Sequence, residues 1–283
     1  MTIGQAKTNL IQSLSTIYDQ REAASIARII FEDVDFLKNR HTHEELNGGH
    51  AALLNKMQSR LLSHEPVQYI LGEADFYGLK FKVSPHVLIP RPETEELVQW
   101  IKNDIENIAP EGAEKTLIDI GTGSGCIALT LQSKLPKIAV TGLDASPLAI
   151  EIVQKNIAHT GIDIQLICMD ILDNKKAATL PIYDYIVSNP PYIVQKDKAE
   201  MQSNVLQHEP HLALFVPDDD PLLFYRHIMI FAQKHLHEGG ALYFEIHEQY
   251  STDVKHLLEK GGFENIVIKK DMSGKDRMVR SVK

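Results

Sequence analysis

The second half of the chain alternates short apolar runs with longer amphipathic stretches, and this alternation constrains the fold more than any other feature. Runs typical of strands occur at 116–120, 138–143, 164–169, 183–188 and 241–246, and helical stretches occur at 124–135, 147–159, 222–236 and around 254–258. The two last runs, 263–270 and 277–282, indicate an antiparallel pair. Strands separated by helices form βαβ units, whose strands lie parallel with helices on both faces. The alternation therefore predicts an α/β fold with a mostly parallel sheet.

The first part of the chain has a different periodicity. Apolar residues recur at helical spacing through 1–72, and no strand-like alternation interrupts them, so we expect a small helical bundle there. In 73–92 two apolar runs meet around Gly78, which indicates a β-hairpin, and three prolines then make a stiff linker. The chain is thus predicted to have a bundle at 1–72, a hairpin and linker at 73–92, and an α/β domain at 93–283.

Composition excludes several classes of protein. The 283 residues carry a formal net charge of -9, so we expect no non-specific binding to nucleic acid, which requires a basic surface. No apolar run is long enough to span a bilayer, and the first residues lack the pattern of a signal peptide, so we expect a cytoplasmic protein. Cys126 and Cys168 stand in apolar surroundings and are predicted to be buried thiols, and the thirteen histidines lack partners at metal-ligand spacing, so no metal site is expected.

The strand at 183–188 is followed directly by Asn189-Pro190-Pro191-Tyr192. The side-chain carbonyl of Asn189 can accept a hydrogen bond, and the main-chain carbonyl of Pro190 can accept another in a direction that the prolines fix. Tyr192 offers a flat aromatic face. Two acceptors beside a flat face suit a planar group that carries an NH2, although Asn-Pro also marks plain rigid turns.

A glycine-rich turn, Asp119-Ile120-Gly121-Thr122-Gly123-Ser124-Gly125, joins the first strand of the α/β domain to its first helix. Glycines let a backbone turn tightly and approach a ligand closely. The spacing is G-x-G-x-G and differs from the G-x-G-x-x-G of dinucleotide-binding folds. The carboxylate of Asp119 is a better neighbour for an ammonium group than for a phosphate. The turn therefore favours a cationic amino-acid cofactor, with a purely structural tight turn as the alternative.

Two further acidic residues end the next two strands. Asp144 follows the glycines by about 20 residues, where a carboxylate can accept hydrogen bonds from ribose hydroxyls. Asp170 can meet an adenine amino group, with Ile171 packing on the ring. Asp119, Asp144 and Asp170 would all line the crevice at the carboxyl ends of the strands, which is where open α/β sheets bind ligands. Their coincidence predicts a cofactor site there.

These motifs together resemble the class I S-adenosylmethionine-dependent methyltransferases that act on planar NH2 groups. More narrowly, the chain resembles the HemK/PrmC family, the release factor glutamine N5-methyltransferases, and the resemblance covers nearly the whole chain. The stretch most specific to that family is 76–85 followed by 87–95, and the helical N-terminus, the turn at 119–125 and Glu209-Pro210 also fit. One departure follows the fifth strand: the family often has glycines after Glu245-Ile246, where this chain has 247–249 as His-Glu-Gln. We interpret that difference as surface variation.

The resemblance implies a fold and a role for each motif. It implies a Rossmann-like class I sheet with an antiparallel last strand, preceded by a helical bundle that recognises the substrate. The cofactor would be bound by Asp119, Gly121, Thr122, Gly123, Ser124, Gly125, Asp144, Asp170, Ile171 and Asn189. The substrate would be bound by Asn189, Pro190, Pro191 and Tyr192, with Asn189, Pro190 and Tyr192 catalytic. Segment 91–94 would cover the cofactor, or would serve only as a linker.

The implied reaction transfers a methyl group from S-adenosylmethionine to the side-chain amide nitrogen, N5, of the glutamine in the Gly-Gly-Gln motif of peptide chain release factors. The product cofactor would be S-adenosylhomocysteine, and we expect a monomer with no membrane partner. An adenine N6 methyltransferase of DNA or RNA is the main rival, because adenine also presents a planar NH2; the acidic composition favours a protein substrate. The glycine spacing argues against a nicotinamide-dependent dehydrogenase, and the intact 189–192 motif argues against a non-catalytic cofactor-binding module.

Overall fold

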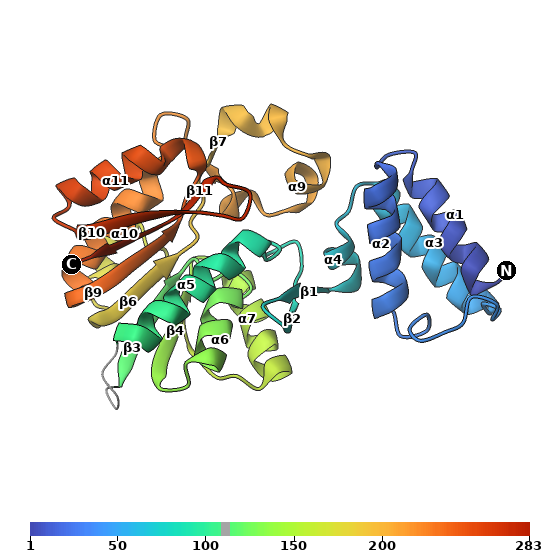
Figure 1. Cartoon of the computed structure of the whole chain (residues 1–283), viewed down its shortest axis with the longest axis horizontal. Helices are drawn as coiled ribbons and strands as arrows, with labels where there is room; N and C mark the ends of the chain where they lie inside the picture. The colour runs from blue at the N-terminus through green and yellow to red at the C-terminus, as the bar shows by residue number, and fades with distance from the viewer. Residues whose placement is uncertain (109–113) are drawn as a thin grey trace. The chain divides into compact units, whose positions relative to one another are not determined.

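The computed structural model describes residues 1–108 and 114–283 (Figure 1). The chain forms two compact units. Unit 1 comprises Met1–Glu73 together with Met201–His208, and unit 2 comprises Ala74–Glu200 together with Glu209–Lys283. The predicted three-part division of the chain, with its boundary at residue 72 and its recognition role for the bundle, stays a prediction.

Unit 1 is helical. Its helices are α1 (Ile3–Leu14), α2 (Gln20–Asp33), α3 (Gly48–Leu62), α4 (Val67–Leu71) and α9 (Ser203–His208). Side chains cap three helix starts: Thr2 accepts from the Gln5 amide, Asp19 from that of Glu22 and Asn47 from that of His50. The apolar stripes of the helices pack into a core of their own, which includes the fully buried Leu10, Leu14, Ala27, Ile30 and Leu61. The helical character expected of this segment is confirmed.

Unit 2 contains a seven-stranded sheet in the order β10-β11-β9-β6-β3-β4-β5. The strands are β3 (Lys115–Ile120), β4 (Ile138–Asp144), β5 (Gln165–Cys168), β6 (Tyr183–Ser188), β9 (Leu236–Glu245), β10 (Glu264–Lys270) and β11 (Asp276–Val282). Strands β5, β4, β3, β6 and β9 are parallel, and β11 is antiparallel to both of its neighbours. The predicted mostly parallel sheet with an antiparallel last strand is confirmed. The order of the strands reverses between β3 and β6, where a crevice opens.

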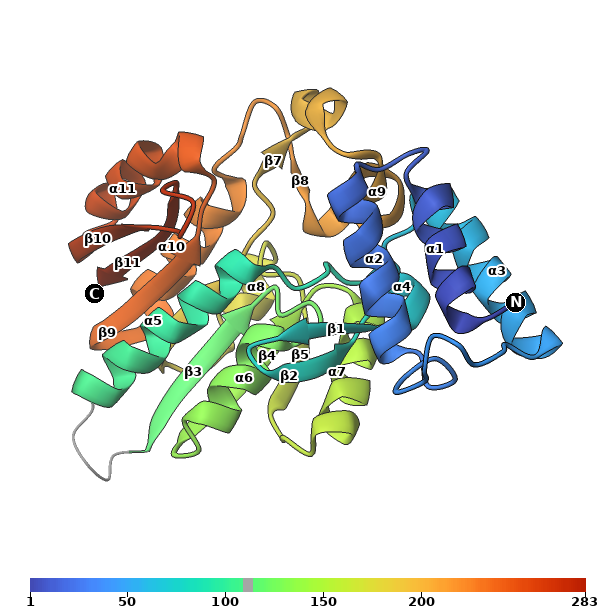
Figure 2. The same ribbon diagram turned by 45° about the vertical axis from the view of Figure 1, so that its right-hand side comes forward.

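Helices cover both faces of this sheet (Figure 2). On one face α5 (Pro92–Ile108), α6 (Cys126–Lys134) and α7 (Pro147–Thr160) share a core with the sheet. On the other face lie α8 (Asn174–Ala177), α10 (Leu223–His235) and α11 (Ser251–Lys260). Successive residues of β3 alternate between the two cores, Leu117 into the first and Ile118 into the second, because side chains on a strand point to opposite faces.

The predicted hairpin is confirmed as β1 (Glu73–Phe76) and β2 (Leu79–Lys82). Its turn residues Tyr77 and Gly78 both have positive φ, 51° and 78°, as a two-residue turn between twisted strands requires. The aromatic rings of Phe76 and Phe81, one on each strand of the hairpin, are both buried in the core beside α5 and α6. The side-chain amide of Asn156 on α7 bonds both the N–H and the carbonyl of Lys82 and so fixes β2.

Three features differ from the expectations. Strand β9 begins at Leu236, five residues early, because its pairing with β6 continues through a bulge at Gly240, where a Cβ would lie 2.8 Å from the Asp184 carbonyl. A short parallel pair, β7 (Ile193–Val194) and β8 (Phe215–Val216), crosses a region expected to be loop. The predicted burial of Cys168 is wrong, since it faces solvent on the edge strand β5, and Cys126 is only half-buried.

Short 3-10 helices complete the described chain: η1 (Gln195–Glu200), η2 (His211–Ala213) and η3 (Glu248–Tyr250). None of the helices in 1–108 and 114–283 combines the length and hydropathy needed to cross a bilayer. Over the same residues no group of three or more His, Cys, Asp or Glu side chains is arranged to hold a metal ion.

Candidate active site

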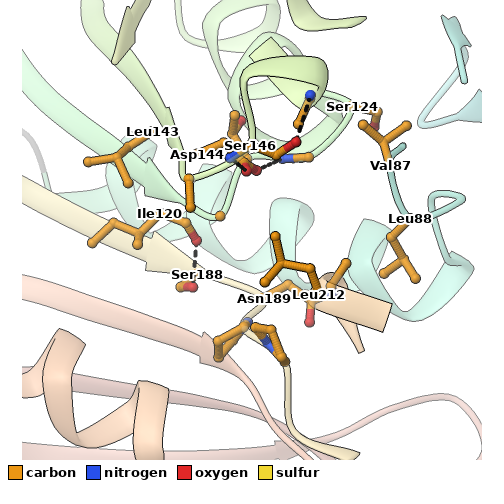
Figure 3. Close-up of a pocket in the computed structure, with 18 of the residues that line it drawn as sticks. Val87, Leu88, Ile120, Ser124, Leu143, Asp144, Ser146, Ser188, Asn189 and Leu212 are labelled. Carbon is orange, nitrogen blue, oxygen red and sulfur yellow. Dashed lines mark hydrogen bonds between the residues drawn. The ribbon is translucent and has the colours of Figure 1, made fainter. Parts of the chain in front are cut away.

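A cavity of about 350 Å³ opens in unit 2 at the carboxyl ends of β3, β4, β5 and β6. This volume lies in the range of small-molecule sites, and the position is the switch point of the strand order. Figure 3 shows Ile120, Leu143 and Asp144 on one side of it, and Asn189 with Leu212 on the other. The crevice predicted from the ends of the strands is therefore present as a cavity.

The glycine-rich turn forms one wall. Gly121, Thr122, Gly123 and Ser124 line the cavity, and Gly121 and Gly123 have left-handed φ values of 76° and 57°. The amides of Gly121 and Thr122 both donate to the Leu143 carbonyl at 2.8 and 2.9 Å, which ties the turn to the end of β4. A side chain at Gly121 would project into open space, so a ligand can approach this peptide closely.

Two residues at the ends of this turn do not line the cavity. Asp119 is fully buried beneath the turn, where the Thr122 hydroxyl donates to its Oδ2 at 2.7 Å. Burial raises the pKa of Asp119 to about 7. Gly125 begins α6 with φ of 80°, and a Cβ there would come within 2.8 Å of Val153 on α7. Their predicted contacts with a cofactor stay predictions, and the structure gives each a role in building the turn.

Acidic residues stand at the ends of β4 and β5, as the sequence predicts. Asp144 lines the cavity, and its two oxygens accept from the amides of Gly123 and Ser146, each at 2.9 Å. Burial raises its pKa above the ordinary value. Asp170 is exposed at the rim, where its Oδ1 accepts from the Leu172 amide. Ile171 is buried and, with Leu143 and Met169, supplies an apolar wall.

The segment after β6 forms the opposite wall. Asn189, Pro190 and Pro191 line the cavity, whereas Tyr192 lies behind it with its hydroxyl 3.4 Å from Glu245 Oε1. The Ser188 hydroxyl donates to the Ile120 carbonyl at 2.6 Å, so the end of β6 is fixed against the end of β3 (Figure 3). This bond sets the glycine-rich turn and the Asn-Pro-Pro segment on facing sides of one space.

Segments far apart in sequence meet at the mouth of the cavity. The cavity is lined there by 85–88, Pro90 and Arg91 of the linker and by Pro210, Leu212 and Ala213 of the later loop. Arg91 forms an ion pair with Glu209, whose carboxylate is almost fully buried and also accepts from the Ile89 amide. The pairing holds the linker against the loop, and this is compatible with the covering role predicted for 91–94.

Two polar residues stand behind Asn189: sequence reasoning missed Glu245 and gave Thr94 only as part of the covering segment 91–94. Thr94, in the first turn of α5, is buried and lines the cavity. Its hydroxyl accepts from Asn189 Nδ2 at 3.3 Å and donates to Glu245 Oε2 at 2.6 Å. Glu245 is buried at the end of β9, and burial raises its pKa. A carboxylate that directly follows the apolar run 241–244 was the available signal for it.

The residues present fit a cofactor with a charged amino-acid part, hydroxyls and a flat ring. Ser124 lines the cavity, and its buried hydroxyl lies beside the Cys126 thiol, which is only a weak hydrogen-bond group, so the turn keeps polar capacity for a ligand. Asp144 supplies acceptors for hydroxyls, since each carboxylate oxygen can accept more than one bond. The wall of Leu143, Met169 and Ile171 suits a ring.

Known proteins of similar sequence agree with this site. The chain is 42% identical to the release factor glutamine methyltransferase of Flavobacterium psychrophilum, over 99% of both chains. It is 41% identical to the release factor glutamine methyltransferase of Bacteroides thetaiotaomicron, over 95% of both. The chain belongs to the release factor glutamine methyltransferase family. Membership makes it a methyltransferase, as the motifs implied.

Two further comparisons agree with this membership. Residues 96–212 match the methyltransferase small domain. Among solved structures, the hMettl16 catalytic domain in complex with an RNA hairpin aligns with a TM-score of 0.56 at 16% identity, covering 83% of this chain and 81% of that one. At such low identity this likeness concerns the methyltransferase fold alone and carries no information about the substrate.

Proposed function

We propose that this chain methylates the side-chain amide nitrogen, N5, of the glutamine in the Gly-Gly-Gln motif of peptide chain release factors. The methyl donor is S-adenosylmethionine, and the products are the N5-methylated glutamine, S-adenosylhomocysteine and a proton that is released to water. One observation carries the proposal: Asn189 and Pro190, each with a carbonyl that can accept a hydrogen bond, line a cavity whose other wall is a glycine-rich turn. The names of the relatives support a release factor glutamine as the substrate.

The proposed cofactor residues divide by chemistry. Gly121, Thr122, Gly123 and Ser124 would hold the amino-acid part, Asp144 the ribose hydroxyls, and Asp170 with Ile171 the adenine. S-adenosylmethionine, when bound, supplies an electrophilic methyl group on a positively charged sulfur. The negative charges at the ends of β4 and β5 favour binding of such a cation.

The chain's own contribution to the reaction would be to hold the amide. An amide nitrogen is a weak nucleophile, because its lone pair is delocalised into the carbonyl. Asn189 Oδ1 and the Pro190 carbonyl would accept its two N–H bonds, which draws electron density onto the nitrogen and fixes its direction. Such fixed orientation is a large source of rate acceleration. Stacking of Tyr192 on the amide plane stays a prediction, because Tyr192 lies behind the cavity wall with its hydroxyl at Glu245.

Adenine also presents a planar NH2, so an adenine N6 methyltransferase is the second candidate. Such an enzyme must grip phosphates and extract a base, and the net charge of -9 disfavours the first requirement. The relatives that cover the whole chain carry a protein substrate in their names. Both points support the release factor.

Radiolabelled S-adenosylmethionine separates these candidates. The protein is incubated with a release factor that contains Gly-Gly-Gln, with the same factor after replacement of that glutamine, and with DNA. We expect label on the intact factor alone. Label on DNA and none on the release factor would overturn the proposal in favour of the adenine reaction. A monomeric, cytoplasmic enzyme stays part of the prediction.

A further inference from the structure

A chain of buried polar groups stands behind Asn189. Asn189 Nδ2 donates to Thr94 Oγ1 at 3.3 Å, and the Thr94 hydroxyl donates to Glu245 Oε2 at 2.6 Å. Thr94 is 3% exposed and Glu245 is 2% exposed, so water does not compete for these bonds. The three residues come from the end of β6, the start of α5 and the end of β9.

The donors and acceptors in this chain can be assigned by counting protons. An ionised carboxylate only accepts, so the single hydroxyl proton of Thr94 must point to Glu245. Thr94 Oγ1 then has only lone pairs facing Asn189, so it can only accept a hydrogen bond from that residue. The NH2 half of the Asn189 side chain is therefore held at Thr94, and its Oδ1 is left for the cavity.

The opposite orientation of the amide would present the wrong group. With the side chain turned over, the NH2 of Asn189 would face the NH2 of a substrate amide, and two donors would oppose each other. A protonated Glu245 permits this arrangement, because its own proton can point to Thr94 and release the Thr94 hydroxyl to donate to Asn189. The charge on Glu245 thus selects the productive orientation.

Several groups act on that charge. Tyr192 donates to Glu245 Oε1, and Arg277 on β11 attracts the carboxylate. Glu93 on α5 repels it, and Tyr225 on α10 donates to the Glu245 main-chain carbonyl. His247 lies two residues further on, with its ring 5.7 Å from that of Tyr192. Burial raises the pKa of Glu245, and Thr94, Arg277 and Tyr192 oppose that rise and favour the ionised form.

We propose that Thr94 and Glu245 are positioning residues for amide methylation: the Glu245 carboxylate, acting through the Thr94 hydroxyl, holds the Asn189 amide with its oxygen towards the substrate nitrogen. The inference rests on the proposed function of the site. It assigns a reaction role to two residues that would not touch the reacting atoms. It also explains why a carboxylate is buried at this point of the sheet.

Matched variants test the assignment. Thr94→Val keeps the shape and removes the hydroxyl, Thr94→Ser keeps the hydroxyl, and Glu245→Gln keeps the shape and removes the charge. Thr130→Val is the control, because Thr130 is equally buried and its hydroxyl has no partner among the described residues. For each variant, kcat and KM for a Gly-Gly-Gln release factor, the Kd for S-adenosylmethionine and the Tm are measured.

We expect Thr94→Val to lower kcat by roughly tenfold to a hundredfold, the worth of one hydrogen bond to a charged group. Its Kd for S-adenosylmethionine should stay within about threefold of the wild-type value, because the lost hydrogen bond is not one of the proposed cofactor contacts. Thr94→Ser should restore most of the rate, and Thr130→Val should keep it. Glu245→Gln should lower kcat by a smaller factor, because a glutamine can bond Thr94 in either orientation.

The pH profile of kcat provides a readout that a purely structural role would not move. Protonation of Glu245 should give the wild type an acid limb, which Glu245→Gln and Thr94→Val should flatten. His247→Gln should keep that limb, which excludes His247 as its source. An acid limb that came from Asp119 or Asp144, whose pKa values burial raises, would persist in Glu245→Gln and Thr94→Val. The inference would be overturned if the loss of kcat in Thr94→Val were explained by a lower Tm, if Thr94→Ser did not restore kcat, and if the acid limb were unchanged.

The two proposals fail in different ways. Transfer to the release factor by the wild type, with undiminished kcat in Thr94→Val, would overturn the positioning role and leave the proposed function standing. A wild type that binds S-adenosylmethionine but transfers nothing to the release factor would overturn the proposed function, and the positioning role with it.

Discussion

At the scale of single residues, the chemistry of the site depends on polar groups at the carboxyl ends of parallel strands. Asp144 ends β4, Asp170 follows β5 and Asn189 follows β6, so the parallel sheet delivers all three to one edge. Asp170 is exposed, whereas Asp144 and Asn189 are partly buried, and the partners of each group decide what it can do. Asn189 has its donor half engaged, whereas both oxygens of Asp144 already bond the backbone.

Replacement of Asn189 by alanine should separate catalysis from cofactor binding. Asn189→Ala removes the proposed side-chain acceptor for the substrate amide and leaves the glycine-rich turn intact. We expect the loss of most methyl transfer, on the order of a hundredfold or more, as for removal of an oriented polar group. The cofactor Kd by calorimetry should stay within about tenfold, a change of about 1.4 kcal/mol. Equal losses in turnover and cofactor affinity would contradict this division of roles.

The buried carboxyl of Asp119 should make stability depend on pH. Its pKa is about 7 in the folded chain and near 4 when unfolded, so between these values the folded state holds an extra proton. The contribution to stability is full below about pH 4 and is lost as the pH rises through about 7. The free energy of unfolding is measured by urea denaturation without cofactor for the wild type and for Asp119→Asn. The wild-type value minus the variant value should fall by on the order of 2–4 kcal/mol from pH 4.5 to 8. Parallel pH curves for the two proteins would contradict this expectation.

Sequence reasoning reached some of these residues and missed others for a physical reason. Asp144 and Asn189 were predictable, because local apolar runs mark the strands that they follow. Glu245 and its contact with Thr94 were missed, because the two residues are 151 residues apart and meet only after α5 packs beside β9. A hydrogen bond between distant segments leaves no local pattern.

At the scale of elements, the start of α6 shows how close packing fixes a residue type. Gly125 and Gly161 both have left-handed backbones, with φ of 80° and 70°. A Cβ on Gly125 would lie 2.8 Å from Val153, whereas a Cβ on Gly161, which ends α7, would meet nothing within 4 Å. The two glycines therefore share the backbone strain and differ in the contact between α6 and α7.

Alanine at each position should separate strain from contact. Gly161→Ala should cost about 1 kcal/mol of unfolding free energy, the penalty for a left-handed residue with a side chain. Gly125→Ala should cost about 1–3 kcal/mol more, as for overpacking in a core. Chemical denaturation of both variants gives the difference directly. Equal costs would mean that α6 and α7 can move apart freely.

The linker and the later loop should depend on one ion pair. Arg91→Ala leaves the buried Glu209 carboxylate unpaired, and we expect a loss of about 3–5 kcal/mol of unfolding free energy. Glu209→Gln removes the buried charge itself and should cost clearly less. Thermal melts of the two variants under the same conditions show which substitution destabilises the chain more. A larger cost for Glu209→Gln than for Arg91→Ala would contradict it.

Most elements were predictable, and their ends were less so. The hairpin, the alternating strands and helices and the antiparallel last strand all follow from periodicity and turn residues. The early start of β9 did not, because Gly239 and Gly240 read as a loop and the pairing with Tyr183 that continues the strand is non-local. The two-residue strands β7 and β8 are too short to have a period.

At the scale of the whole molecule, the two units have separate hydrophobic cores. Leu10 lies in the core of unit 1 and Leu258 in a core of unit 2, and both are fully buried. Leu10→Ala and Leu258→Ala should each cost about 2–5 kcal/mol in their own core. We expect Leu10→Ala to raise amide hydrogen exchange in 1–73 and to leave β3 and β6 protected, with the reverse for Leu258→Ala. Uniform acceleration across the chain in either variant would contradict two independent cores.

The strand order also has a consequence for folding kinetics. The cavity depends on the pairing of β3 with β6, and the bond that closes it joins Ile120 and Ser188, which are 68 residues apart. Such non-local parallel pairing forms slowly, because the entropy cost of closing a long loop comes before the stabilising contacts form. A partly folded chain in which β3 has paired only with β4 carries the glycine-rich turn and lacks Asn189 opposite it. The complete cofactor pocket should therefore arise late in folding, and the cofactor should slow unfolding far more than it speeds refolding.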